Sequence, residues 1–200
     1  MNRISHIART VGWAGAVTLT SLLASWAAIG FLLAHDAKLT VVFAVVAFLL
    51  DALDGFLARR LGTASEFGRM LDSMVDAVNY SVLSSLVTSQ LLLPGTLGWI
   101  VGFVILACGI LRLVLFTVGG YETDGDRLYY TGIVTPHLSL AVALVYFASR
   151  IVTIDEWVIA AILLVLAVGQ LSTVRTRKTG VLVFWIPVST LIAIGALVWL

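Results

Sequence analysis

The stretch KLTVVFAVVAFLLDALDGFLARR, residues 38–60, joins a long apolar run to a cluster of charged residues. Between Lys38 and Asp51 the only polar residue is Thr40. A bilayer core about 30 Å thick requires about 20 apolar residues in a helical span, and this stretch is long enough. Its apolar residues are continuous and do not alternate with polar ones, which argues against a membrane strand. The stretch therefore predicts a transmembrane helix that carries acidic residues near one end.

The rest of the chain has the same character. The 200 residues are 60% hydrophobic and only 12% charged, whereas soluble proteins carry roughly 25% charged residues. The mean hydropathy is +1.08, and there are too few polar side chains to cover a soluble globule. Further spans are predicted at about 11–34, 68–93, 95–118, 132–149, 154–174 and 181–199. We therefore expect an all-α polytopic membrane protein with a single domain, residues 1–200, and with no internal repeat.

Basic residues in the short loops predict how the chain crosses the membrane. With the N-terminus in the cytoplasm, only Lys38 and Arg150 fall on the outer side. The cytoplasmic side then holds ten basic residues: Arg3, Arg9, Arg59, Arg60, Arg69, Arg112, Arg127, Arg175, Arg177 and Lys178. This asymmetry predicts an integral membrane protein with its N-terminus in the cytoplasm and its acidic cluster at the cytoplasmic face.

Four aspartates lie in two neighbouring spans. Asp51 and Asp54 are three residues apart, and Asp72 and Asp76 are four apart, so each pair shares one face of its helix. Only about seven residues connect the two spans, which allows them to be antiparallel neighbours with the two pairs facing each other. Each ionised aspartate in a span costs on the order of 2.5–3.5 kcal/mol, so this concentration indicates a functional site.

Carboxylates gathered in this way repel one another unless cations lie between them. Hard oxygen ligands favour Mg²⁺ or Mn²⁺, with the remaining positions filled by phosphate oxygens of a substrate. Four carboxylates are enough for two ions. The alternative is structural, with the aspartates capping helices or pairing with Arg59, Arg60 and Arg69. That alternative explains one aspartate more easily than four in this register.

The region 51–76 contains a spaced motif with eight fixed positions. They are Asp51, Asp54, Gly55, Ala58, Arg59, Gly68, Asp72 and Asp76, with eight residues between Arg59 and Gly68. This spacing resembles the signature of the CDP-alcohol phosphotransferase family at every fixed position. The resemblance implies a bundle of six transmembrane helices, here with one extra C-terminal apolar segment. It also implies a homodimer and a transfer reaction that depends on Mg²⁺ or Mn²⁺ and releases CMP.

The resemblance also assigns roles to individual residues. The four aspartates hold the metals, and Asp76 is in addition the general base for the acceptor hydroxyl. Gly55, Arg59 and Ser65 contact the CDP part of the donor, and the small residues Ala58 and Gly68 complete that site. Arg59 offers a permanently charged fork that suits phosphate. In many relatives an Asn of the first span approaches the nucleotide, but this chain has only two asparagines, Asn2 and Asn79.

The residues after the motif indicate the acceptor alcohol. The run Asp72-Ser-Met-Val-Asp76-Ala-Val-Asn-Tyr80 resembles bacterial and archaeal phosphatidylserine synthases, whereas glycerophosphate-type relatives usually have Lys where this chain has Ala77. Arg112, inside an apolar span, is a candidate to bind the carboxylate of L-serine or a phosphate. Its alternative is to extend its charge to the membrane interface. The substrates implied are CDP-diacylglycerol and L-serine, within the lipid bilayer.

Several alternatives remain open at this point. The acceptor could instead be inositol phosphate or glycerol phosphate, and the transfer could be direct or pass through a covalent phosphatidyl intermediate. A divalent-cation transporter would also place aspartates in the membrane, but we would expect them to be spread through its depth. A silent scaffold would tolerate loss of a motif position, and none is lost. Signatures for zinc, nucleotide P-loops or nucleic-acid binding are absent from the sequence.

Overall fold

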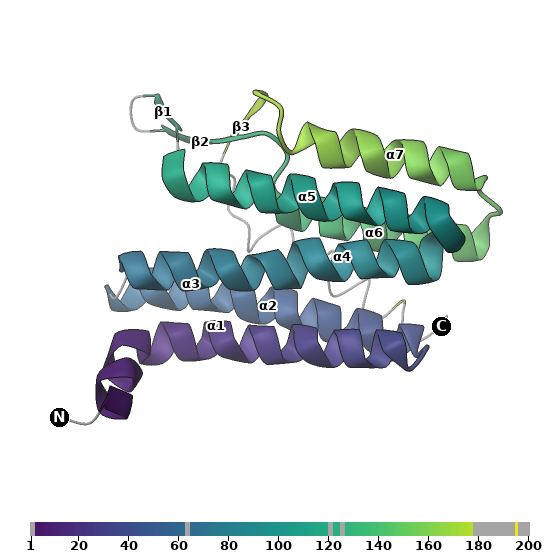
Figure 1. The fold of residues 1–200 in the computed structure, drawn as a ribbon. Coiled ribbons are helices and arrows are strands. Elements are labelled where there is room, and N and C mark those ends of the chain that lie inside the picture. Colours follow the sequence, from purple (N-terminus) through teal and green to yellow (C-terminus); the bar gives the residue numbers. More distant parts are fainter. Residues whose placement is uncertain (1–2, 63–64, 120–121, 125–126, 178–194, 196–200) are drawn as a thin grey trace.

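The computed structural model of the chain describes residues 3–62, 65–119, 122–124, 127–177 and 195. Its helices lie side by side with their axes in roughly a common direction (Figure 1). The α-helices are α1 (Arg3–Leu33), α2 (Ala37–Leu61), α3 (Glu66–Asp76), α4 (Leu83–Val87), α5 (Gly95–Gly119), α6 (Thr135–Ile151) and α7 (Glu156–Gly169). Two π-helical segments, η1 (Ala77–Val82) and η2 (Thr88–Leu92), join α3 and α4 into one long helical run.

The first helix changes direction near its start. Gly12 has φ 60° and ψ −172°, a conformation that a residue with a side chain rarely adopts. The segment before it turns away from the rest of α1, as Figure 1 shows at the N-terminus. The straight part of α1 packs against α2 and α3. The break therefore separates the first residues from the helix that supports the acidic spans.

Glycines allow α5 to pack closely against the run from α3 to η2. A Cβ atom on Gly102 would lie 2.9 Å from the carbonyl oxygen of Ser85. One on Gly98 would lie 3.1 Å from the Cα atom of Ser89 and would collide with the carbonyl of Leu93, in the connection just before α5. Near the other end of the contact, a Cβ atom on Gly109 would collide with the side chain of Ser81. Small residues at such positions are typical of helix pairs in membranes, because the backbones can approach closely.

Three helices of the described residues are long and apolar enough to cross a membrane: Val11–Leu33, Ala37–Ala58 and Gly95–Gly119. They correspond to the spans expected at 11–34, 38–60 and 95–118. The helical run 66–92 corresponds to the expected span 68–93, but it carries four charged residues in its first eleven. The expected span 181–199 lies outside the described residues, apart from Gly195.

The expected spans 132–149 and 154–174 are helical over a shorter length. Helix α6 has 17 residues and α7 has 14. At a rise of about 1.5 Å per residue, 14 residues extend only about 21 Å, less than the hydrocarbon core. Both helices pack into the main core, in which Ile105 of α5, Leu138 of α6 and Leu163 of α7 are almost completely buried. The described residues thus show a membrane protein of packed helices, without establishing six complete crossings.

Three short strands were not expected from the sequence. The polar segment 119–131 contains β1 (Glu122–Asp124) and β2 (Arg127–Thr131), which pair antiparallel. Strand β3 (Arg175–Arg177) then pairs antiparallel with β2. The ribbon lies at the end of the bundle where α2 connects to α3 (left in Figure 1). Since it lies beyond the ends of α5 and α7, its strands do not conflict with helical spans.

Candidate metal centre

Three of the four motif aspartates meet between α2 and α3. Asp51 comes from the second half of α2, and Asp72 and Asp76 come from consecutive turns of α3. Each contributes one carboxylate oxygen to a group in which all of these oxygens lie within 4.8 Å of one another. The antiparallel arrangement predicted from the short connection is what brings these side chains together.

The chemistry of this group fits a divalent cation. Asp51 Oδ1 and Asp76 Oδ1 are buried and have no hydrogen-bond partner among the described residues. Burying a carboxylate oxygen without a partner is costly, and a cation shared by the three carboxylates would remove that cost. Oxygen-only ligands match Mg²⁺ or Mn²⁺ better than the softer transition metals.

The fourth aspartate lies one turn further along α2. Asp54 is only 3% exposed, although it lies near the end of a helix rich in exposed residues. Its carboxylate does not belong to the three-membered group. Three carboxylates within 4.8 Å suit one cation, so a second ion would depend on Asp54 and on oxygens supplied by the substrate.

The small residues of the motif continue the face of α2 that carries the aspartates. Gly55 and Ala58 are half-buried; Gly55 follows Asp54 directly, and Ala58 lies one turn after Asp54. Arg59 belongs to the same helix, but its side chain lies outside the part of the chain that the structure describes. The predicted contact of Arg59 with phosphate therefore stays a prediction.

Ser65 and Gly68 form the start of α3. Ser65 is the N-cap, and its hydroxyl oxygen accepts a hydrogen bond of 3.0 Å from the backbone N–H of Gly68. A Cβ atom on Gly68 would lie 3.2 Å from that oxygen, so glycine keeps the cap uncrowded. Ser65 is exposed, and its capping role is separate from the donor contact that the family resemblance implies.

Arg112 is buried and does not extend to the surface, so the interfacial alternative is wrong for this residue. It is 6% exposed, and its Nε donates a 3.2 Å hydrogen bond to the carbonyl of Ile133. Its guanidinium lies 5.3 Å from the centre of the Phe116 ring. On either side of it, Gly109 contacts Ser81 and the Thr117 hydroxyl lies 3.0 Å from that of Ser73. Arg112 is therefore level with the part of the helical run that begins at Asp76.

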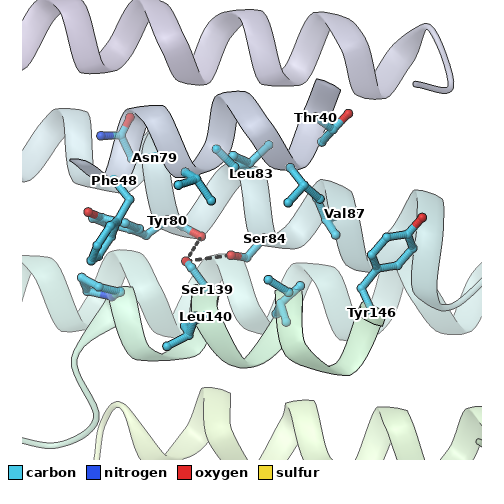
Figure 2. A pocket seen from close by; sticks show the side chains of 16 residues that line it. Thr40, Phe48, Asn79, Tyr80, Leu83, Ser84, Val87, Ser139, Leu140 and Tyr146 are labelled. Atoms are coloured by element: carbon cyan, nitrogen blue, oxygen red, sulfur yellow. Dashed lines mark hydrogen bonds between the residues drawn. The ribbon is translucent and has the colours of Figure 1, made fainter. Parts of the chain in front are cut away.

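An apolar groove leads away from the aspartates between α2, the η1–α4 run and α6. Its cavity measures about 90 Å³ and is partly open. At one end the ring of Tyr80 lies beside that of Phe48, with ring centres 6.3 Å apart, and Tyr146 lies at the other end (Figure 2). Aliphatic residues such as Val45, Leu83 and Val142 form most of the wall. A groove of this kind beside a polar centre suits an amphiphilic molecule.

Sequence reasoning did not foresee the contacts of Tyr80 and Asn79. The Tyr80 hydroxyl donates a 2.7 Å hydrogen bond to Asp51 Oδ2. Asn79 is buried; its side-chain N–H donates to Ser21, and its oxygen accepts from the hydroxyl of Ser25, at 2.8 and 2.7 Å. Asn79 thus joins η1 to the first span through hydrogen bonds to two of its serines. In the sequence, the intervals of four residues from Asp72 to Asp76 to Tyr80 indicate that Tyr80 shares a helix face with the two aspartates.

Comparison with known proteins agrees with this geometry. The family model described as CDP-alcohol phosphatidyltransferase matches residues 12–169. The chain belongs to this family. The match includes α1 from Gly12, both acidic helices, α5, α6 and α7, so membership does not rest on the aspartate motif alone.

Several curated members of the CDP-alcohol phosphatidyltransferase family are similar to the chain. The CDP-diacylglycerol–serine O-phosphatidyltransferase of Mycobacterium leprae is 33% identical over 60% of this chain and 41% of its own length. The protein of the same name from Bacillus subtilis is 32% identical over 51% and 59%. The archaetidylserine synthase of Methanothermobacter thermautotrophicus is 31% identical over 64% and 55%. The chain thus spans about two fifths to three fifths of the length of these relatives.

Proposed function

We propose that the chain transfers a phosphatidyl group from CDP-diacylglycerol to the hydroxyl of L-serine, forming phosphatidylserine and CMP. The observation that carries the proposal is the group of three close carboxylates with buried, unpartnered oxygens on Asp51 and Asp76. Family membership supplies the reaction class. The names of the similar proteins favour serine as the acceptor.

The surroundings of the carboxylates support a lipid-linked substrate rather than an ion in transit. The apolar groove begins at Tyr80, which contacts Asp51, and runs away from the charges along α2 and α6. A lipid whose headgroup lies at the aspartates could place an acyl chain there. A transport path would need polar groups along its depth. The close group of carboxylates instead comes from Asp51, Asp72 and Asp76, at one place between α2 and α3.

Asp51, Asp72 and Asp76 would hold a divalent cation, Mg²⁺ or Mn²⁺, and Asp54 would help to hold a second ion. The metal, when bound, neutralises the diphosphate and the charge that develops on the leaving CMP. Asp76 accepts the proton of the serine hydroxyl while the hydroxyl oxygen of serine forms a bond to the phosphorus that carries the diacylglycerol. The bond between that phosphorus and the CMP oxygen then breaks. Gly55 and Ala58 leave room for the nucleotide, and Arg59 and Ser65 contact the diphosphate.

The membrane setting follows from the same features. The apolar helices place the chain in a bilayer, and we propose a prokaryotic inner membrane with the aspartates near its cytoplasmic face. A homodimer and a six-helix bundle are proposed on family membership alone. The carboxylate of serine would be bound by Arg112, the buried cation level with Asp76.

The direct test is an assay of the purified protein in detergent with CDP-diacylglycerol and Mg²⁺ or Mn²⁺. CMP release should require serine, should be much slower with inositol phosphate or glycerol phosphate, and should stop when EDTA removes the metal. If CMP is released with inositol phosphate or glycerol phosphate but not with serine, then that phosphorylated alcohol is the acceptor. No CMP release with any acceptor would refute the proposed activity.

The role of Asp76 as general base can be tested with a substitution that keeps the shape of its side chain. Asp76→Asn removes the proton acceptor and one metal ligand, so CMP release should fall by more than about 100-fold, within the range that a general base contributes. Asp155→Asn is the matched control, because Asp155 is exposed and caps α7 through the backbone N–H of Trp157. Asparagine caps helices equally well, so this control should keep full activity. A normal rate for Asp76→Asn would exclude the role of Asp76 as base.

A further inference from the structure

Tyr80 holds one of the two oxygens of Asp51. Its hydroxyl donates to Asp51 Oδ2 at 2.7 Å, while Asp51 Oδ1 is buried without a hydrogen-bond partner among the described residues. A carboxylate oxygen that already accepts a short hydrogen bond is a poorer metal ligand than one without a partner. The two oxygens of Asp51 are therefore unequal, and Oδ1 is the one left for a cation.

The position of Tyr80 in the helical run directs it toward Asp51. Asp72, Asp76 and Tyr80 follow one another at intervals of four residues, so they lie along one side of the run that faces α2. Tyr80 lies within η1, the π-helical segment that begins directly after Asp76. Single π-helical turns are often found at functional sites.

Tyr80 is fixed from three directions. Its ring packs edge-on against Phe48 of α2, one turn before Asp51. Its backbone carbonyl accepts a 3.1 Å hydrogen bond from the hydroxyl of Ser139 in α6. The hydroxyl of Ser84 in turn donates to Ser139 at 2.8 Å, and Figure 2 shows these two bonds meeting at Ser139. With 3% of its surface exposed, Tyr80 has little freedom to move away from Asp51.

We propose that Tyr80 is a positioning residue that makes Asp51 bind the cation through Oδ1 alone. The proposal rests on the proposed metal role of the aspartates. Partners of metal ligands fix the orientation of the ligand, and their loss typically lowers metal affinity by about 10- to 100-fold. Tyr80 does not touch the reacting atoms, so it acts on the reaction through Asp51.

The test measures Mn²⁺ affinity of the full chain in detergent without any lipid or serine, by the loss of the free-ion EPR signal. Tyr80→Phe keeps the ring against Phe48 and removes only the hydroxyl, so the dissociation constant for Mn²⁺ should rise about tenfold. The metal concentration for half-maximal CMP release should rise in parallel. The rate at saturating metal should stay within about threefold of the wild-type rate.

Tyr146→Phe is the matched control. It removes the hydroxyl of another buried tyrosine of the same groove, far from Asp51, and should leave Mn²⁺ affinity unchanged. An unchanged Mn²⁺ affinity in Tyr80→Phe would overturn the proposal, as would an equal loss in both variants or no Mn²⁺ binding by the wild-type chain. Because no substrate is present, a chain that binds Mn²⁺ but transfers nothing would refute the proposed reaction and still test Tyr80.

Discussion

Because Arg112 is buried, its charge acts inside the helix bundle and not at the membrane interface. An arginine that contacted lipid would extend its guanidinium to the interface, whereas this side chain is 6% exposed and donates to the carbonyl of Ile133. The positive charge of Arg112 therefore lies inside the helix bundle, where it would attract an anionic group of the acceptor. The carboxylate of serine is such a group, and so is the phosphate of inositol phosphate or glycerol phosphate, so the preference for serine rests on the similar proteins and not on Arg112.

Replacing Arg112 should separate binding of the acceptor from binding of the donor. In Arg112→Ala the KM for serine should rise by more than about tenfold, the order expected for losing a charge-assisted hydrogen bond of about 2 kcal/mol. The KM for CDP-diacylglycerol should change much less, and Arg112→Lys should restore part of the serine affinity. Arg150→Ala is the control and should behave as wild type. Arg150 lies in the last turn of α6, whereas Ile133, which Arg112 contacts, lies just before the start of that helix. An unchanged KM for serine would show that Arg112 does not bind the acceptor and that its role is structural, through contacts such as those with Ile133 and Phe116.

At the scale of single residues, the sequence predicted that four aspartates meet, and the structure groups three of them without Asp54. The sequence did not predict how these side chains are held. The three- and four-residue spacings of the aspartates placed Asp51, Asp72 and Asp76 on facing helices, and the structure brings their oxygens together. The contact between Tyr80 and Asp51 depends on the distance between two helices and on the start of a π-helical turn at Ala77. Neither the distance between the two helices nor the start of the π-helical turn can be predicted from the spacing of residues within one helix.

At the scale of elements, the contact between α5 and the helical run is set by glycines. Gly98 and Gly102 face backbone carbonyls, and carbonyls cannot rotate aside as a side chain can. Helix positions and approximate ends followed from hydropathy, because an apolar segment in a bilayer must satisfy its backbone internally. The strands β1 to β3 did not follow from hydropathy, because they are short and because β2 pairs with β3, a segment more than 40 residues away.

Adding a methyl group at this contact should destabilise the protein. Gly102→Ala should cost about 1–3 kcal/mol through overpacking against the Ser85 carbonyl, and Gly98→Ala should cost more because its methyl group would collide with Leu93. Gly30→Ala is the control, because no atom lies within 4 Å of the added methyl group. Thermal unfolding in detergent should rank the variants in the order Gly30→Ala, Gly102→Ala, Gly98→Ala, from most to least stable. Equal midpoints would show that α5 is not closely packed there.

At the scale of the whole molecule, the strand pairing supports one part of the predicted topology. Sequence reasoning placed both the polar segment 119–131 and the basic stretch after residue 174 in the cytoplasm. The structure pairs β2 with β3, which requires the two segments to lie on the same side of the membrane. The connection between α2 and α3 lies at this same end (Figure 1). The four aspartates belong to the half of α2 and the half of the helical run 66–92 that are nearer this connection. The pairing does not itself determine which side is the cytoplasm.

Cysteine labelling in intact bacteria would identify that side. The chain has a single cysteine, Cys108, which is buried, so Cys108→Ala provides a background without thiols. In it, Glu66→Cys places an exposed thiol at the start of α3, and Thr153→Cys places one in the α6–α7 connection. The excess of basic residues predicts that an impermeant maleimide labels Thr153→Cys in intact cells and Glu66→Cys only after lysis. The reverse pattern would place the aspartates, and with them the proposed reaction, on the outer face, where cytoplasmic CDP-linked donors and serine are not available.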